Sequence, residues 1–109
     1  MGLDITVTQM RTIRCPHCGE IVDERIVAEA DSGGRVWYPF LESVGYYVPY
    51  EMRTEENDWY GKDMKLTKDQ INHLFRYCQD TKAYNYHEVA SLVAIAEALG
   101  DAVVINADW

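Results

Sequence analysis

The residues best suited to chemistry form one short motif, Cys15-Pro16-His17-Cys18-Gly19. Two cysteines separated by two residues, with a glycine after the second, are typical of the turn that holds zinc, an ion that takes four thiolate or imidazole ligands in a tetrahedron. The motif occurs once, and the chain has three cysteines and three histidines in total. It therefore supplies half of a zinc site.

The other half of such a site has to come from distant parts of the chain. A zinc site would join Cys15 and Cys18 to two further ligands drawn from His17, His73, Cys78 and His87. The set of Cys15, Cys18, Cys78 and His87 requires the fold to bring three elements together, and Cys78 falls on the apolar stripe of a predicted helix, where it is better placed for the core. The alternative is a turn that keeps the knuckle geometry without a metal. A redox pair like that of thioredoxin-like disulfide oxidases needs a helix after the motif, whereas Gly19 and a β-branched segment follow here.

The second candidate site is the turn Ser32-Gly33-Gly34-Arg35, which runs directly into Val36-Trp37-Tyr38. Glycine-rich turns expose backbone N–H groups that can hold an anion, and an arginine adds a planar bidentate donor. The tryptophan and tyrosine are flat side chains on which a base could stack. An ordinary turn with core aromatics has the same pattern, so both interpretations stay open.

A segment rich in aromatic and polar residues, Asn57 to Lys62, is the predicted partner of this turn. Eight tyrosines and three tryptophans are more than a core of this size needs, and such side chains anchor interfaces and line ligand pockets. The acidic stretch from Glu51 to Asp58 is interpreted as a solvated face. The predicted ligand-binding residues are Ser32, Gly33, Gly34, Arg35, Trp37, Tyr38, Trp59 and Tyr60.

Catalysis has little support in the sequence. His87-Glu88 lacks the second histidine of a metalloprotease helix, and the chain has neither a serine in a nucleophile elbow nor a clear pair of carboxylates. We therefore expect a non-catalytic protein.

Composition limits the class of partner. The chain has 109 residues, 18 acidic against 10 basic, and a formal charge of −8, which repels a phosphate backbone and argues against nonspecific nucleic-acid binding. The same charge suits docking on a basic protein surface. The odd cysteine count, together with the lack of a signal sequence or a membrane-length apolar run, predicts a cytoplasmic protein with no membrane partner.

Periodicity and turn signals predict one α+β domain over residues 1–109, with the cysteine motif at the tip of an N-terminal hairpin. Thr67-Lys68-Asp69-Gln70 is a capping box that predicts the start of a helix, and Gly100 is expected to end a second helix that begins at Asn85. The predicted elements, in chain order, are strands at 5–13 and 20–30, a short helix at 39–44, a long loop at 46–65 with a short strand at 47–50, helices from 67 and from 85, and a last strand at 102–107.

The predicted core combines the apolar stripes of the two main helices with the last strand. Ala102 to Ala107 is a continuous apolar run, which predicts a strand buried on both faces. The residues expected to be buried are Ile71, Leu74, Phe75, Cys78, Val89, Leu92, Val93, Ala96, Leu99 and Val104.

Three segments together resemble small uncharacterised accessory proteins of bacteriophages and prophages. They are the opening Met1-Gly2-Leu3-Asp4-Ile5, the Ser32–Arg35 turn running into Trp37-Tyr38-Pro39, and Trp59-Tyr60-Gly61-Lys62. The resemblance implies a binding role inside a bacterial host cell, including action against host defence systems. It brings no known active site, so no functional residue is carried over from it.

Three functions are consistent with these observations. The first is a binding protein that sequesters a small anionic, nucleotide-like ligand on the predicted ligand-binding residues. The second is an acidic, tyrosine-rich inhibitor that occupies a basic site on a host protein. The third is a small structural zinc module, with self-association left open.

Overall fold

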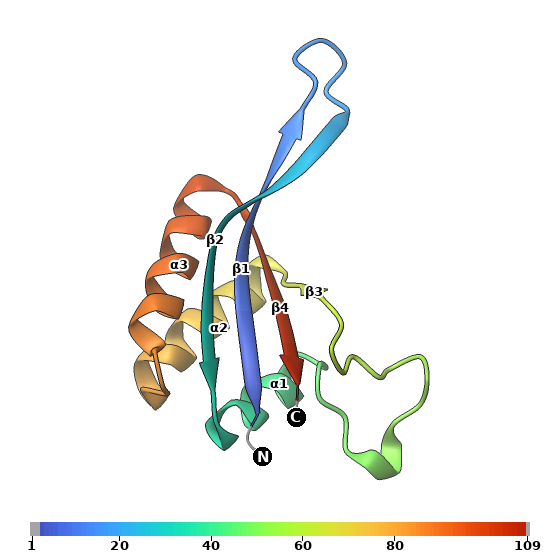
Figure 1. Ribbon diagram of the computed structural model, residues 1–109, viewed down its shortest axis with the longest axis vertical. Coiled ribbons are helices and arrows are strands. Elements are labelled where there is room, and N and C mark those ends of the chain that lie inside the picture. Colours follow the sequence, from blue (N-terminus) through green and yellow to red (C-terminus); the bar gives the residue numbers. More distant parts are fainter. Residues whose placement is uncertain (1–2, 109) are drawn as a thin grey trace.

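The computed structural model describes residues 3–108, so Met1 and Gly2, which belong to the opening of the phage resemblance, lie outside the described residues. The fold is α+β, with an antiparallel sheet of four strands in the order β2-β1-β4-β3 (Figure 1). The strands are β1 (Asp4–Arg14), β2 (Ile21–Gly33), β3 (Met64–Lys65) and β4 (Ala102–Asp108). The helices are α1 (Tyr38–Ser43), α2 (Lys68–Thr81) and α3 (Tyr86–Leu99), with short 3-10 turns η1 (Arg35–Trp37) and η2 (Tyr50–Met52).

The predicted N-terminal hairpin is confirmed, and it is longer than the rest of the sheet. β1 pairs with β2 from Asp4 to Arg14, whereas β4 accompanies β1 only from Asp4 to Met10. Beyond Met10 the two strands continue alone, and the loop that contains Cys15 and Cys18 projects from the body of the molecule (Figure 1). We call residues 11–25 the ribbon.

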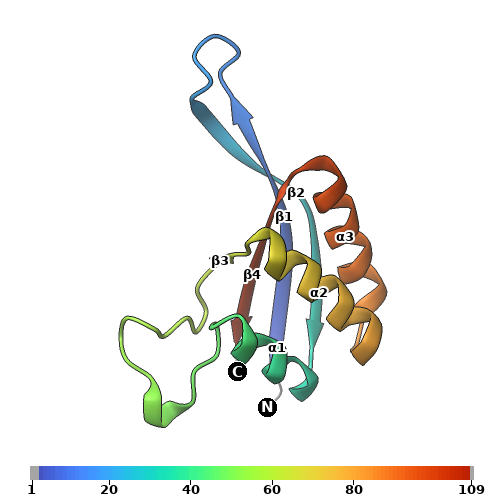
Figure 2. The same cartoon turned by 180° about the vertical axis from the view of Figure 1, so that it is seen from behind.

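Helices α2 and α3 cover one face of the sheet, as the view from behind shows (Figure 2). β1 and β4 point alternate side chains at these helices, and the buried residues of both layers form one apolar cluster. The predicted helix stripes are confirmed in that cluster for Ile71, Leu74, Cys78, Val89, Leu92, Val93 and Ala96.

The prediction that β4 is buried on both faces is wrong. Val103, Ile105 and Ala107 are buried, but Val104 is partly exposed because the helices cover only one side of the sheet. Leu99 was expected inside and is 60% exposed, since it lies in the last turn of α3, next to the Gly100 stop. Phe75 lies at the margin, partly buried against the core.

The signals at the ends of the two main helices are confirmed. Thr67 caps α2 by accepting a hydrogen bond from the Gln70 backbone, and the Gln70 side chain accepts one from the Thr67 backbone. Asn85 is the residue before α3, but its amide donates to the Asp31 carbonyl at 2.8 Å and to Glu88 at 3.1 Å, so it ties the helix start to β2. Gly100 ends α3 with a φ of 74°.

The long loop between α1 and β3 is held at the end of the sheet by Tyr46. This side chain is buried, and its hydroxyl donates to the Lys62 carbonyl at 2.6 Å and accepts from the Ala107 backbone at 2.8 Å. Burial raises the pKa of Tyr46 above its usual value. The strand predicted at 47–50 is replaced by irregular chain that leads into η2.

None of the helices within residues 3–108 is long and apolar enough to span a membrane.

Candidate anion-binding site

The glycine turn that we predicted as an anion cradle is packed against the start of β1. The Gly34 N–H donates to the Leu3 carbonyl at 2.8 Å. A Cβ on Gly33 would come within 2.7 Å of that same carbonyl oxygen, so the close approach of the two strands requires glycine there. The Gly34 N–H is therefore not available to an anion in this conformation.

Ser32 and Trp37 also have structural partners. The Ser32 hydroxyl is buried, donates to the Tyr84 carbonyl and accepts a hydrogen bond from the Trp37 indole at 2.9 Å. Trp37 is completely buried and packs against the rings of Phe40 and Tyr77. Trp37 therefore has no free ring face on which a ligand could stack. Ser32 and Trp37 instead connect β2 to the helical layer.

The other predicted ligand-binding residues are more accessible. Arg35 is exposed, Tyr38 and Trp59 are half-buried, and Tyr60 is 48% exposed. Tyr38 packs edge-on against Tyr47, with ring centroids 4.9 Å apart. The ring centroids of Trp59 and Tyr46 are 6.2 Å apart. The structure thus brings both predicted segments to one pair of neighbouring tyrosines.

The cysteine motif keeps the predicted knuckle turn. The Cys15 N–H donates to the Glu20 carbonyl at 2.7 Å, and the Gly19 N–H donates to the Cys15 carbonyl at 2.9 Å. Backbone N–H groups of Cys18 and His17 and the neighbouring Cys18 thiol hydrogen-bond to the Cys15 sulfur, and they lower the pKa of Cys15. These are the bonds that stabilise a thiolate.

The predicted ligand set of Cys15, Cys18, Cys78 and His87 is not assembled. Cys78 is buried on the inner stripe of α2, where desolvation raises its pKa to about 12. His87 lies near Ala28 and Glu29 of β2, below the ribbon. Within residues 3–108, no three His, Cys, Asp or Glu side chains form a group that could hold a metal.

A cavity that sequence reasoning did not predict lies where the ribbon leaves the sheet. It is open to solvent on one side, has a volume of about 600 Å³ and is bordered by the β1 arm of the ribbon, the β3–α2 connection and the turn between α3 and β4. Four of the ten basic residues of the chain line it, namely Arg11, Arg14, Lys65 and Lys68. Only Glu97 and Asp101 among its lining residues are acidic, so an acidic protein has concentrated positive charge at this place.

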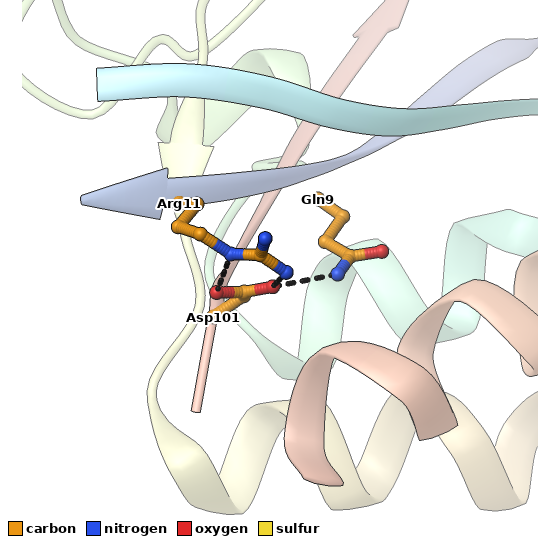
Figure 3. Close-up of polar contacts among 3 residues, drawn as sticks. All are labelled: Gln9, Arg11 and Asp101. Carbon is orange, nitrogen blue, oxygen red and sulfur yellow. Dashed lines mark hydrogen bonds and ion pairs between the residues drawn. The ribbon is translucent and has the colours of Figure 1, made fainter. Parts of the chain in front are cut away.

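One wall of the cavity is fixed by a polar cluster (Figure 3). Asp101 accepts hydrogen bonds from Arg11 at 3.1 and 3.0 Å and from Gln9 at 2.7 Å. Hydrogen bonds from Arg11 and Gln9 hold the pKa of Asp101 below its usual value. Because the fork of Arg11 is engaged through Nε and one Nη, the guanidinium is held in one orientation beside the cavity.

The remaining cations differ in their freedom to bind a ligand. Arg14 donates to the Gly19 carbonyl at 3.0 Å, so it also holds the knuckle turn. Lys65 and Lys68 are exposed, and neither ammonium has a hydrogen bond or ion pair within residues 3–108. The two lysines are therefore the groups best placed to meet an incoming anion.

The signal for this cavity was present in the sequence but divided among separate segments. Arg11 and Arg14 end the first strand, and Lys65 and Lys68 flank the start of the capping box. Each pair is unremarkable by itself, and only the fold brings the two pairs together. Comparisons with protein-family models, curated proteins and solved structures found no match for this chain.

Proposed function

We propose that this protein is a non-catalytic binding protein that holds a small phosphate-bearing ligand in the cavity lined by Arg11, Arg14, Lys65 and Lys68. The observation that carries the proposal is the concentration of four of the ten basic residues around one cavity in a chain of net charge −8. The phage resemblance adds a context for this role, the sequestering of a nucleotide-like molecule in a bacterial host cell.

Charge and size define the ligand class. Arginine and lysine are the side chains that bind phosphate oxygens, and a cavity of about 600 Å³ is in the range that encloses a small organic ligand. An extended polyanion would meet the acidic remainder of the surface, whereas a compact ligand contacts only the cavity. The proposal therefore favours a nucleotide or a short phosphate chain over nucleic acid.

Isothermal titration calorimetry with pyrophosphate and ADP as probes tests this proposal. The Lys65→Ala and Lys68→Ala variants should each weaken binding about tenfold, the loss expected for one charge-assisted hydrogen bond. Arg76→Ala is the matched control, because Arg76 is an exposed cation of α2 outside the cavity and should leave affinity unchanged.

Arg35→Ala separates this cavity from the site predicted at the glycine turn. Loss of affinity in Arg35→Ala with wild-type affinity in Lys65→Ala and Lys68→Ala would move the ligand to the turn. Failure of the wild-type protein to bind either probe would refute the cavity as a phosphate site.

The uncovered face of the sheet favours a second candidate function, the inhibition of a host protein through a basic site. Glu29 and Asp63 lie beside Thr6 and Thr8 on this face, and Asp31 accepts a hydrogen bond from Thr6 at 2.9 Å. These carboxylates would complement a basic partner surface. Reversal of charge in Glu29→Lys and Asp63→Lys should then abolish the effect of the chain in a host cell while pyrophosphate binding persists.

A further inference from the structure

The knuckle at the tip of the ribbon is a half-site that is ready for a metal. Its two cysteines are separated by two residues in a turn that is closed by backbone hydrogen bonds, from the Gly19 N–H to the Cys15 carbonyl at 2.9 Å and from the Cys15 N–H to the Glu20 carbonyl at 2.7 Å. Cys15 is half-exposed and Cys18 is exposed, so both sulfurs can be reached from solvent. Such a turn presents two thiolates to a tetrahedral ion with little rearrangement.

The chain cannot complete the site by itself in this fold. Zinc in a structural site takes four ligands, and within residues 3–108 no three His, Cys, Asp or Glu side chains form a group that could hold a metal. The third cysteine, Cys78, is buried under the sheet, and the ribbon carries the knuckle away from the body (Figures 1 and 2). A zinc site at the knuckle would therefore take its remaining ligands from another molecule.

Apolar side chains on the ribbon and directly after it are exposed, and a partner would cover them. Ile21 is 56% exposed, and Ile26 and Val27, where the ribbon joins the sheet, are 59% and 43% exposed. A two-stranded ribbon with no layer packed on it is marginally stable in water, so a contact that buries these β-branched residues would stabilise it.

From these observations we propose that two copies of this chain share one zinc ion at their ribbon tips, with Cys15 and Cys18 of each copy as its four ligands. The ion Zn²⁺ replaces the four thiol protons, which are released to solvent, and no oxidant or reductant is required. A second copy supplies the same half-site, so the tetrahedron closes by symmetry. None of the four ligand cysteines lines the cavity, although Arg14 contacts both places, since it lines the cavity and donates to the Gly19 carbonyl of the knuckle turn.

The test combines metal analysis with light scattering on the full-length, untagged chain in a reducing buffer. The proposal predicts a dimer that contains one zinc ion per two chains and that becomes a monomer when a zinc chelator removes the metal. Replacement of zinc by cobalt should give the visible spectrum of a tetrahedral tetrathiolate site, which reports the ligands directly.

Variants at the tip identify the ligands. Cys15→Ser and Cys18→Ser should each be zinc-free monomers with an unchanged far-ultraviolet circular dichroism spectrum, since both residues lie outside the core. His17→Ala is the matched control, because His17 is exposed in the same turn and should keep both the metal and the dimer.

Three results would overturn the proposal. They are one zinc ion bound to a monomeric chain, a dimer that persists in Cys18→Ser, and a reduced wild-type chain that takes up no zinc when the ion is added.

Discussion

Gln9 is a buried polar side chain at the edge of the core, and its environment explains how one wall of the cavity is built. Its amide is only 1% exposed and donates to Asp101, which in turn fixes Arg11. A buried amide needs a partner, and a carboxylate that accepts three hydrogen bonds is favoured in its ionised form. The same contacts that satisfy Gln9 therefore fix a cation in the lining of the cavity.

Asp101→Asn should remove a source of stability that depends on pH. The pKa of Asp101 is lowered below 3.8 in the folded protein, so its contribution is present above that value and is lost as pH falls through the folded pKa. Thermal unfolding across pH should show wild type more stable than the variant at neutral pH, with the difference shrinking in acid. A difference that stays constant through this range would contradict the ion pair.

Leu74 and Leu99 provide a matched pair of leucines, one inside the core and one outside it. Leu74 is fully buried and Leu99 is 60% exposed. Leu74→Ala should lower the free energy of unfolding by about 2–5 kcal/mol because it leaves a cavity under the sheet. Leu99→Ala should lower the free energy of unfolding by less than about 1 kcal/mol. Equal losses for the two variants in urea denaturation would show that the buried face of the helices is assigned wrongly.

At the scale of elements, α2 depends on its capping box. The Thr67 hydroxyl accepts from the Gln70 backbone at 3.3 Å, and the Gln70 side chain accepts from the Thr67 backbone at 2.9 Å. Thr67→Ala should lower the free energy of unfolding by about 0.5–2 kcal/mol. Thr67→Ser retains the hydroxyl and serves as control, and a similar loss in both variants would show that the cap contributes nothing.

The Tyr46 hydroxyl is one of several groups that hold the loop before β3 against β4, beside the Gly61 N–H, which donates to the Ala107 carbonyl, and the Asn106 amide, which donates to the Gly61 carbonyl. Tyr46→Phe keeps the packing of the ring but leaves the Lys62 carbonyl and the Ala107 N–H without this partner, so it should cost about 1–3 kcal/mol. Hydrogen exchange should also become faster in residues 57–63, which the hydroxyl holds against β4. Unchanged exchange there would mean that other contacts are sufficient.

The sequence predicted the elements whose signals are local. The capping box marked the start of α2, Gly100 marked the end of α3, and the cysteine motif marked the hairpin tip. The error at β4 arose because a continuous apolar run does not reveal that only one face of the sheet is covered by helices. Val104 thus belongs to the open face.

At the scale of the whole molecule, the cavity could not be predicted because its cations lie in two segments about fifty residues apart. Arg11 and Arg14 come from the part of β1 that lies in the ribbon, whereas Lys65 and Lys68 flank the start of α2. The glycine turn, in contrast, had a clear local pattern that serves the packing of Ser32 and Trp37. We therefore base the proposed ligand site on charge gathered by the fold and not on a short motif.

The most direct test of the proposed site is a nuclear magnetic resonance titration of the isotope-labelled chain with pyrophosphate. We predict that backbone amide shifts concentrate in residues 11–14, 65–68 and 99–102, which surround the cavity. The shifts should saturate with added ligand and disappear in a variant that combines Lys65→Ala and Lys68→Ala. Shifts confined to residues 32–38, or no saturable shifts at all, would contradict the assignment of the cavity as the ligand site.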